Sequence, residues 1–132
     1  MTDRAGVRSD AARLLVVDDE ERLRETFIRA LAGRGYAVTG AASFGSALRE
    51  LSSGTFDLLL VDINLPDGTG WDILRIIRAK GSAVPVIVLS AIPPQSTLVR
   101  ELQPDGVLYK PFPMDALFRL IERALGVSSP ED

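Results

Sequence analysis

The sequence predicts an α/β domain in which helices cover a parallel β-sheet. From Arg13 onward, short runs rich in leucine and β-branched residues alternate with longer stretches whose apolar residues recur at helical spacing. This alternation is typical of a parallel sheet, because each strand must be followed by a crossover helix. Three of the strand candidates are apolar throughout, as expected for strands buried on both faces. The five candidates are Leu14–Val17, Tyr36–Thr39, Leu58–Val61, Val86–Leu89 and Val107–Tyr109.

The segments between these strands carry the narrow apolar stripes of helices that pack on one side. Four stripes are well formed: Leu23, Phe27, Ala30 and Leu31; Phe44, Ala47, Leu48 and Leu51; Trp71, Leu74 and Ile77; and Leu117, Leu120, Ile121 and Ala124. We expect Gly33 and Gly35 to stop the first helix. A further helix, of about two turns around Leu98–Leu102, should be the least stable, because Pro93-Pro94 delays its start and Pro104 closes it.

Length and composition indicate one globular domain. The chain has 132 residues, of which 46% are hydrophobic and 25% are charged, which is the balance of an ordinary folded domain with a complete core. We expect the domain to span residues 13–126. Residues 1–12 are interpreted as a flexible N-terminal extension, and residues 127–132 as a flexible tail or the start of a linker.

Several classes of function are disfavoured by what the sequence lacks. It contains neither cysteine nor histidine, which excludes thiol nucleophiles, phosphohistidine carriers and imidazole-based metal sites. The 15 basic residues are spread among 18 acidic ones without a basic block, so we expect no direct nucleic-acid binding. No apolar run approaches the roughly 20 residues that span a bilayer, and we expect a cytoplasmic protein without membrane contact.

Polar residues directly follow four of the strand candidates. Asp18, Asp19 and Glu20 follow the first, Asp62 the third, Ser90 the fourth and Lys110 the fifth. Ligands of parallel α/β sheets bind at the carboxyl ends of the strands. If these four strands lie side by side, their terminal residues converge on one edge of the sheet.

Carboxylates that converge in this way repel one another unless a cation neutralises them. Carboxylate oxygen is the ligand that Mg²⁺ prefers, and Mg²⁺ commonly binds phosphate oxygens as well. Lys110 and Ser90 could then contact the remaining oxygens of a phosphoryl group. Each residue alone also has a structural explanation: a helix N-terminus for Asp18-Asp19-Glu20, a turn for Asp62, a strand-end turn for Ser90 and a solvated side chain for Lys110. It is their joint placement that favours a site.

The order of these residues resembles the receiver domain of response regulators, of the chemotaxis-regulator type. The resemblance lies in Asp18-Asp19, in Asp62 followed by Leu65-Pro66 and Gly70, in Ser90-Ala91, and in Lys110-Pro111-Phe112. It implies a flavodoxin-like, doubly wound fold with five parallel strands in the order 2-1-3-4-5 and helices on both faces. The Lys110-Pro111 peptide bond is expected to be cis.

The resemblance also implies the role of each site residue. Asp62 is the expected phosphoacceptor. Asp18, Asp19, Asp62 and the backbone carbonyl of Asn64 are the expected Mg²⁺ ligands, with Asp18 acting through water. Ser90 and Lys110 are expected to hold the phosphoryl oxygens.

Two features depart from the family pattern. Many relatives carry an aromatic switch residue three positions before the lysine, where this chain has Val107, and Tyr109 instead stands next to Lys110. The interval between Ser90 and Lys110 is also shorter than usual, so the fourth helix could be truncated or displaced. We therefore treat Val107 and Tyr109 as the candidate switch region.

The sequence thus predicts a signalling switch that a sensor histidine kinase or a phosphotransfer protein phosphorylates on Asp62. A downstream output domain or protein would read the switch, and a homodimer is a possible form. It would phosphorylate and dephosphorylate itself rather than act as a turnover enzyme. Two alternatives stay open at this point: a pseudo-receiver that serves only as a scaffold, and a phosphatase with an aspartate nucleophile. Haloacid-dehalogenase-like phosphatases need a second Asp two residues after the nucleophile, where this chain has Asn64.

Overall fold

The structure is a computed structural model of the chain and describes residues 11–92 and 96–126. The segments expected to be flexible, 1–12 and 127–132, lie outside the described residues except for Ala11 and Ala12. The domain limits that we inferred therefore stay a prediction. Pro93 and Pro94 also lie outside the described part.

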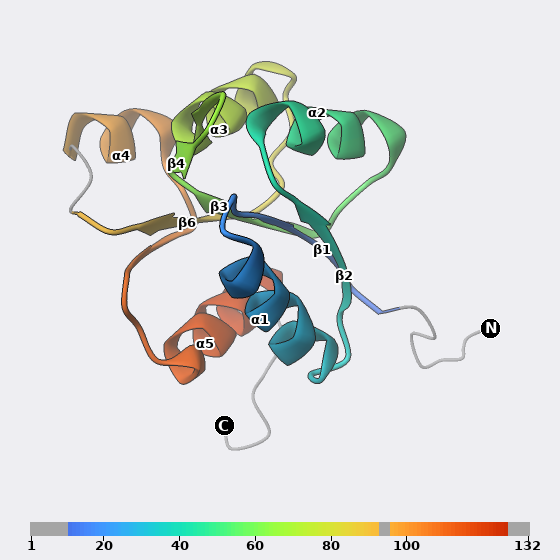
Figure 1. Cartoon of the computed structure of the whole chain (residues 1–132). Helices are drawn as coiled ribbons and strands as arrows, with labels where there is room; N and C mark the ends of the chain where they lie inside the picture. The colour runs from blue at the N-terminus through green and yellow to red at the C-terminus, as the bar shows by residue number, and fades with distance from the viewer. Residues whose placement is uncertain (1–10, 93–95, 127–132) are drawn as a thin grey trace.

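A five-stranded parallel sheet forms the centre of the domain (Figure 1). Its strands are β1 (Arg13–Val17), β2 (Ala37–Ala41), β3 (Leu58–Asp62), β6 (Val86–Ser90) and β7 (Gly106–Tyr109). They are ordered β2-β1-β3-β6-β7, which confirms the predicted order because β6 and β7 are the fourth and fifth strands of this sheet. Because β3 pairs with β1 on the side opposite β2, the strands β1, β3, β6 and β7 lie side by side, as the candidate site requires.

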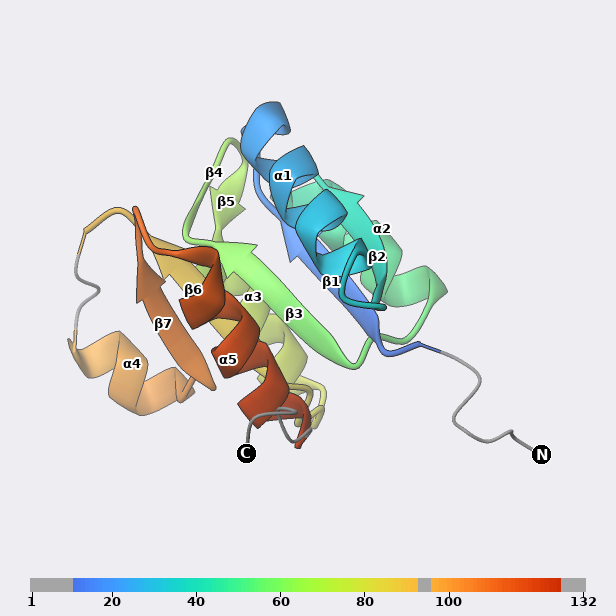
Figure 2. The same ribbon diagram turned by 90° about the horizontal axis from the view of Figure 1, so that it is seen from below.

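Helices cover both faces of the sheet. Helices α1 (Glu21–Ala32) and α5 (Met114–Leu125) lie on one face, and α2 (Phe44–Ser53), α3 (Gly70–Ala79) and α4 (Ser96–Leu102) lie on the other (Figures 1 and 2). Within the described ranges, no helix combines the length and the apolar character needed to cross a membrane. Helix α4 has seven residues, in agreement with the two turns expected. It ends just before Gln103, whose φ is 50°, and Pro104.

The core has two layers because successive strand residues point to opposite faces of the sheet. Leu15, Val17, Leu59 and Val61 pack against α2 and α3, whereas Leu14, Val16, Leu58 and Leu60 pack against α1 and α5. All eight are completely buried, and burial of each such side chain contributes about 1.5–3 kcal/mol. This double burial fixes β1 and β3 and hence the residues at their carboxyl ends.

Several boundaries differ slightly from those expected from the sequence. Strand β2 begins at Ala37 because the Tyr36 N–H donates instead to the Leu31 carbonyl at the end of α1. In the α1–β2 turn, Gly33 keeps a right-handed conformation and Gly35 takes the positive φ of 95°. Helix α2 begins at Phe44, the first residue of its predicted apolar stripe, because Ser43 is its N-cap.

A two-stranded hairpin between β3 and α3 was not predicted. It consists of β4 (Asn64–Leu65) and β5 (Gly68–Thr69), which pair in antiparallel orientation. The sequence suggested no more than a turn at Asp62. Because the hairpin begins two residues after Asp62, it forms one wall of the candidate site.

Candidate functional site

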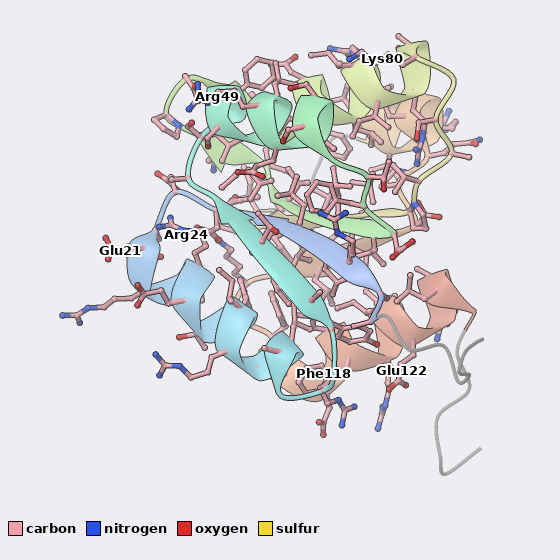
Figure 3. All side chains as sticks on the ribbon, turned by 90° about the vertical axis from the view of Figure 1, so that its right-hand side faces the viewer. Glu21, Arg24, Arg49, Lys80, Phe118 and Glu122 are labelled. Atoms are coloured by element: carbon pink, nitrogen blue, oxygen red, sulfur yellow. The ribbon has the colours of Figure 1, made fainter. Side chains whose placement is uncertain are left out.

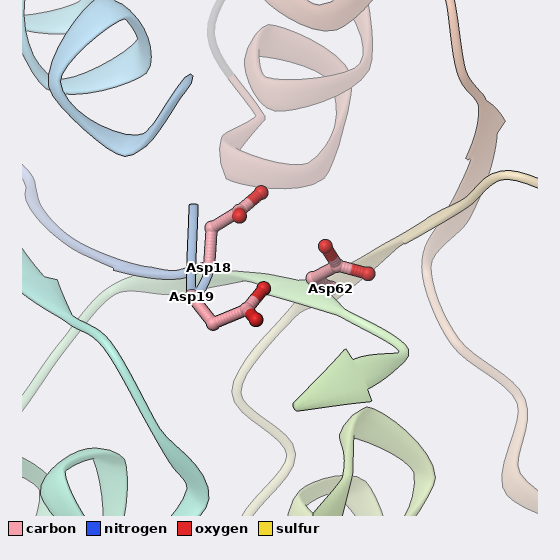
Figure 4. A group of neighbouring side chains, drawn as sticks. All are labelled: Asp18, Asp19 and Asp62. Atoms are coloured by element: carbon pink, nitrogen blue, oxygen red, sulfur yellow. The ribbon is translucent and has the colours of Figure 1, made fainter. Parts of the chain in front are cut away.

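Three carboxylates meet where β1 and β3 end (Figure 4). One oxygen from each of Asp18, Asp19 and Asp62 lies within 4.8 Å of the other two. Asp18 follows β1 directly and is 0% exposed, Asp62 is the last residue of β3 and is 6% exposed, and Asp19 is open to solvent. The structure therefore brings together the three side chains that the sequence predicted as metal ligands.

Lys110 completes this cluster from the far side of β6. Its ammonium nitrogen lies 2.8 Å from Asp62 Oδ2 and 3.5 Å from Asp18 Oδ2. The backbone N–H of Lys110 donates to the Ser90 carbonyl over 2.8 Å, so that β7 continues to pair with β6 up to the site. The Lys110-Pro111 bond is cis, as expected. Phe112 then stacks on Phe27 of α1, with ring centroids 6.0 Å apart.

The electrostatics of the cluster favour an additional cation. Burial raises the pKa of Asp18, and the Glu20 N–H and Lys110 offset this effect only in part. Burial by itself would lower the pKa of Lys110, but its hydrogen bond to Asp62 and the charge of Asp18 outweigh burial, and the pKa ends above its usual value. Lys110 therefore stays charged, while a negative charge on Asp18 remains costly. One ammonium group does not fully compensate the carboxylates.

The donor set fits a hard divalent cation such as Mg²⁺, which binds oxygen ligands and few carboxylates at a time. Asn64 stands at the start of β4, and its N–H donates to Asp62 Oδ1 over 3.1 Å. This bond holds the hairpin against the carboxylate. The role of the Asn64 carbonyl as a metal ligand stays a prediction.

Ser90 ends β6 at the same edge of the sheet and is 3% exposed. Among the described residues, both hydrogen bonds of its hydroxyl are made with Ile92: it donates to the Ile92 carbonyl and accepts from the Ile92 N–H over 3.3 Å. The hydroxyl is thus at the site but engaged with the β6–α4 loop. Its one proton is donated to the Ile92 carbonyl and would have to leave that carbonyl to be donated to a group on Asp62.

The two candidate switch residues lie on β7, two positions apart and so on the same face of the sheet. Val107 is opposite Val88 and is partly buried, whereas Tyr109 is opposite Ser90 and is 51% exposed. Tyr109, the aromatic residue of the edge strand β7, is therefore the residue that pairs with Ser90 of β6. Whether either residue moves with the state of Asp62 stays a prediction.

Supporting residues around the carboxylates were missed by sequence reasoning. Arg24 Nη1 donates to the backbone carbonyl of Asp18 over 2.9 Å and thereby ties α1 to the acidic loop; its position on α1 can be seen in Figure 3. Asp67, at the hairpin tip, accepts hydrogen bonds from the first two residues of α2. Arg24 lies only six residues after Asp18, so the sequence offered a local signal for this contact. The partner of Asp67 lies 22 residues or more away and left no local signal.

Gly70 was noted in the sequence only as part of a resemblance, and the structure explains its presence. A Cβ atom at this position would lie 2.6 Å from the carbonyl oxygen of Asp62 and 2.9 Å from a methyl group of Val61. The first turn of α3 therefore approaches the end of β3 more closely than any side chain allows. The adjacent Thr69 caps α3 by accepting from the Asp72 N–H over 3.1 Å.

Comparisons with known proteins identify the family of the chain. The family model of the response regulator receiver domain matches residues 14–122. The transcriptional regulatory protein CusR of Escherichia coli K12 is 32% identical over 115 residues, which cover 86% of this chain and 51% of CusR. The response regulator MprA of Mycobacterium tuberculosis H37Ra is 34% identical over 124 residues, 92% of this chain and 54% of MprA. The chain spans about half the length of these curated relatives.

Solved structures share the fold over nearly their whole length. The response regulator TrrA of Thermotoga maritima, in complex with Mg²⁺-BeF, has a TM-score of 0.80 and 32% identity, covering 86% of this chain and 99% of TrrA. A CheY-like receiver domain of Methanospirillum hungatei has a TM-score of 0.84 and 26% identity, covering 89% of this chain and 95% of its own. These are signalling proteins rather than turnover enzymes. The chain belongs to the family of response regulator receiver domains of two-component signalling.

Proposed function

We propose that this chain is a cytoplasmic signalling switch that accepts a phosphoryl group on Asp62 from a sensor histidine kinase or a phosphotransfer protein. The observation that carries the proposal is the placement of the Lys110 ammonium 2.8 Å from Asp62, within a cluster of three carboxylates whose oxygens lie within 4.8 Å. Phosphoryl transfer depends on positioning and charge neutralisation more than on covalent assistance. A lysine beside a carboxylate cluster that can bind a cation suits this requirement.

Asp62 is the nucleophile in the proposed reaction. A carboxylate oxygen of Asp62 attacks the phosphorus of a phosphohistidine, a new P–O bond forms, and the P–N bond breaks. The bonding pair leaves with the imidazole of the donor, which is protonated by solvent. Hydrolysis of the resulting acyl phosphate by water returns Asp62 to its carboxylate form, so that the modification is transient and self-reversing.

Asp18, Asp19, Asp62 and the carbonyl of Asn64 would hold the Mg²⁺ ion. When bound, the ion would supply positive charge both to the clustered carboxylates and to the phosphoryl oxygens. The donor set supports this assignment, and the related TrrA was crystallised with Mg²⁺-BeF. The Lys110 ammonium group, which acts as a point charge, would donate to a phosphoryl oxygen in place of Asp62.

Ser90 would carry the signal away from Asp62. Its hydroxyl is engaged with Ile92 in the structure, and contact with a phosphoryl oxygen would release the β6–α4 loop. Val107 and Tyr109, on the adjacent strand β7, would respond to this change. A phosphoryl group can shift the equilibrium between the two loop positions only because it contacts Ser90 in one of them.

The readout would be a downstream output domain or a separate protein, with a homodimer as a possible signalling form. The regulators CusR and MprA extend well beyond the part that this chain matches, which suits an output function outside the receiver domain. We propose no direct nucleic-acid contact by this domain, because its basic residues form no block.

The deciding experiment is to incubate the purified protein with Mg²⁺ and an acyl phosphate and to follow its intact mass. We expect one phosphoryl adduct that requires Mg²⁺ and is lost in Asp62→Asn. The matched control is Asp115→Asn, which removes an exposed carboxylate from the first turn of α5 and should leave labelling unchanged.

Other outcomes would support a different function. Equal labelling of Asp62→Asn would eliminate Asp62 as the acceptor. Binding of Mg²⁺ without any adduct would favour the pseudo-receiver scaffold. Multiple turnover of a phosphomonoester would instead indicate a phosphatase.

A further inference from the structure

The hairpin β4–β5 is anchored at its tip to the start of α2, on the far side of the candidate metal site from Lys110. We propose that Asp67 is a positioning residue for the metal site: by binding the first two N–H groups of α2, it holds the loop that carries Asn64 in place relative to Asp18. The inference rests on the proposed function, because it concerns the same site.

Asp67 satisfies two of the four N–H groups that a helix N-terminus leaves without an intrahelical partner. Its Oδ1 accepts from the Phe44 N–H over 2.7 Å, and its Oδ2 accepts from the Gly45 N–H over 2.9 Å. The next two N–H groups donate to Ser43, through its side chain and its carbonyl. The N-terminus of α2 is thus shared between a local cap and a residue from another loop.

The carboxylate is well suited to this position. The two N–H groups point at its two oxygens, and the positive end of the helix dipole favours a negative charge there. In agreement, the Gly45 and Phe44 N–H groups hold the pKa of Asp67 below its usual range. Asp67 is therefore charged wherever the protein is folded near neutral pH.

Close packing accompanies these hydrogen bonds. A Cβ atom at Gly68 would lie 3.0 Å from the ring of Phe44, so the hairpin tip rests directly on the first residue of α2. The hairpin itself has only two residues in each strand. Because the hairpin has so few hydrogen bonds between its own strands, we infer that the contact of its tip with α2 adds to the Asn64–Asp62 bond in holding it in place.

The segment that leads from β2 into α2 is also bound to the loop that carries Asp18. The Asp18 N–H donates to the Ala41 carbonyl over 3.0 Å, and Ala41, which ends β2, is 4% exposed. Residues 41–45 therefore connect the two loops that supply the site: Asp18 at one end through Ala41, and the Asn64 hairpin at the other through Asp67. Outer-shell contacts of this kind fix the ligands of metal sites and affect affinity when they are lost.

The test separates positioning from helix stability. Asp67→Ala removes the contact between hairpin and helix, whereas Ser43→Ala removes the local cap of the same helix and leaves the hairpin contact intact. Asp67→Asn retains an acceptor and serves as the conservative variant. Each protein is studied in its unphosphorylated form at neutral pH. Calorimetry gives the Mg²⁺ dissociation constant, hydrogen exchange gives the exchange rate of the Asn64 amide without metal, and urea unfolding gives the midpoint.

We expect Asp67→Ala to weaken Mg²⁺ binding by about tenfold, the lower end of the loss that outer-shell changes cause. Amide exchange of Asn64 should also become faster. Ser43→Ala should lower the urea midpoint by a similar amount and leave both other quantities at their wild-type values. Asp67→Asn should recover a substantial part of the affinity.

Equal effects of Asp67→Ala and Ser43→Ala on Mg²⁺ binding and on Asn64 exchange would reduce Asp67 to a helix cap. Wild-type values for Asp67→Ala would overturn the inference as well. If the wild-type protein bound no Mg²⁺, the metal assignment of the proposed function would fail. Exchange of Asn64 in the metal-free proteins would still decide whether Asp67 holds the loop.

Discussion

The ammonium nitrogen of Lys110 lies 2.8 Å from Asp62 Oδ2 although the strand β6 separates their two strands in the sheet. The long side chain of Lys110 reaches across the end of β6 because Lys110 follows the edge strand β7 at the same end of the sheet as Asp62. Its charge compensates Asp62 and, at 3.5 Å, Asp18. The ammonium group is thus a stabilising partner of both carboxylates, and under the proposed function we expect it to contact the phosphoryl group once Asp62 carries one.

Lys110→Ala should destabilise the protein and slow the labelling of Asp62. Removal of the ammonium group leaves two buried carboxylates without their counter-charge, which costs about 1–3 kcal/mol. Added Mg²⁺ should restore part of this loss, because a cation in the carboxylate cluster replaces the missing charge. Urea unfolding with Mg²⁺ and with EDTA checks this. Lys80→Ala, which removes an exposed lysine at the end of α3, is the control and should show no such difference.

Much of the fold could be predicted because its signals are local. The apolar runs of β1, β3 and β6 and the stripes of α1, α3 and α5 occur in the sequence at the spacing that the structure uses. The positions of the strand ends were then sufficient to predict the site residues Asp18, Asp62, Ser90 and Lys110. The order of the strands came from the family resemblance, since no single segment specifies its neighbours in a sheet.

The remaining features depend on contacts between distant segments. The Asp67 carboxylate binds N–H groups of α2 that lie 22 residues or more away in the sequence, so no local pattern indicates this contact. The engagement of Ser90 with Ile92 depends on a hydroxyl rotamer, which sequence does not specify. The hairpin β4–β5 is too short to produce a strand pattern. Each of these features is defined by contacts that exist only in the folded chain.

Mg²⁺ should raise the thermal stability of the wild-type protein, because a ligand that binds only the folded state stabilises it. The gain is about 2.7 kcal/mol when the free ion is at a hundred times its dissociation constant. Asp19→Asn should lose most of this response. Without metal it should be at least as stable as the wild type, because one of three mutually repelling carboxylates is gone.

Thermal melts with Mg²⁺ and with EDTA provide this measurement. Glu101→Gln removes an exposed charge on α4 and should keep the full response. Equal stabilisation of the wild type and Asp19→Asn would show that the ion binds elsewhere.

Gly70→Ala should destabilise the protein by about 1–3 kcal/mol, the usual cost of forcing an extra carbon into a packed site. The new Cβ would meet the Asp62 carbonyl at 2.6 Å, so labelling of Asp62 should fall as well. Gly33→Ala is the matched control: its φ of −63° suits alanine, and the change should be neutral or stabilising by up to about 1 kcal/mol. Urea midpoints and labelling rates distinguish the two variants. A Gly70→Ala protein with wild-type stability would contradict the close approach of α3 to β3.

Ser90→Ala should accept a phosphoryl group on Asp62 but fail to transmit its presence to the β6–α4 loop. In the wild type, the one proton of the hydroxyl can be donated either to the Ile92 carbonyl or to a phosphoryl oxygen. Beryllofluoride with Mg²⁺ should therefore draw the hydroxyl away from Ile92, weaken the bond that it accepts from the Ile92 N–H and accelerate amide exchange there. In Ser90→Ala, exchange at Ile92 should already be fast and should not change on addition of beryllofluoride. Ser90→Thr, which keeps the hydroxyl, should restore the response. If exchange at Ile92 were the same in the wild type before and after addition, although fluorine NMR showed bound beryllofluoride, the hydroxyl would not be the link between Asp62 and the loop.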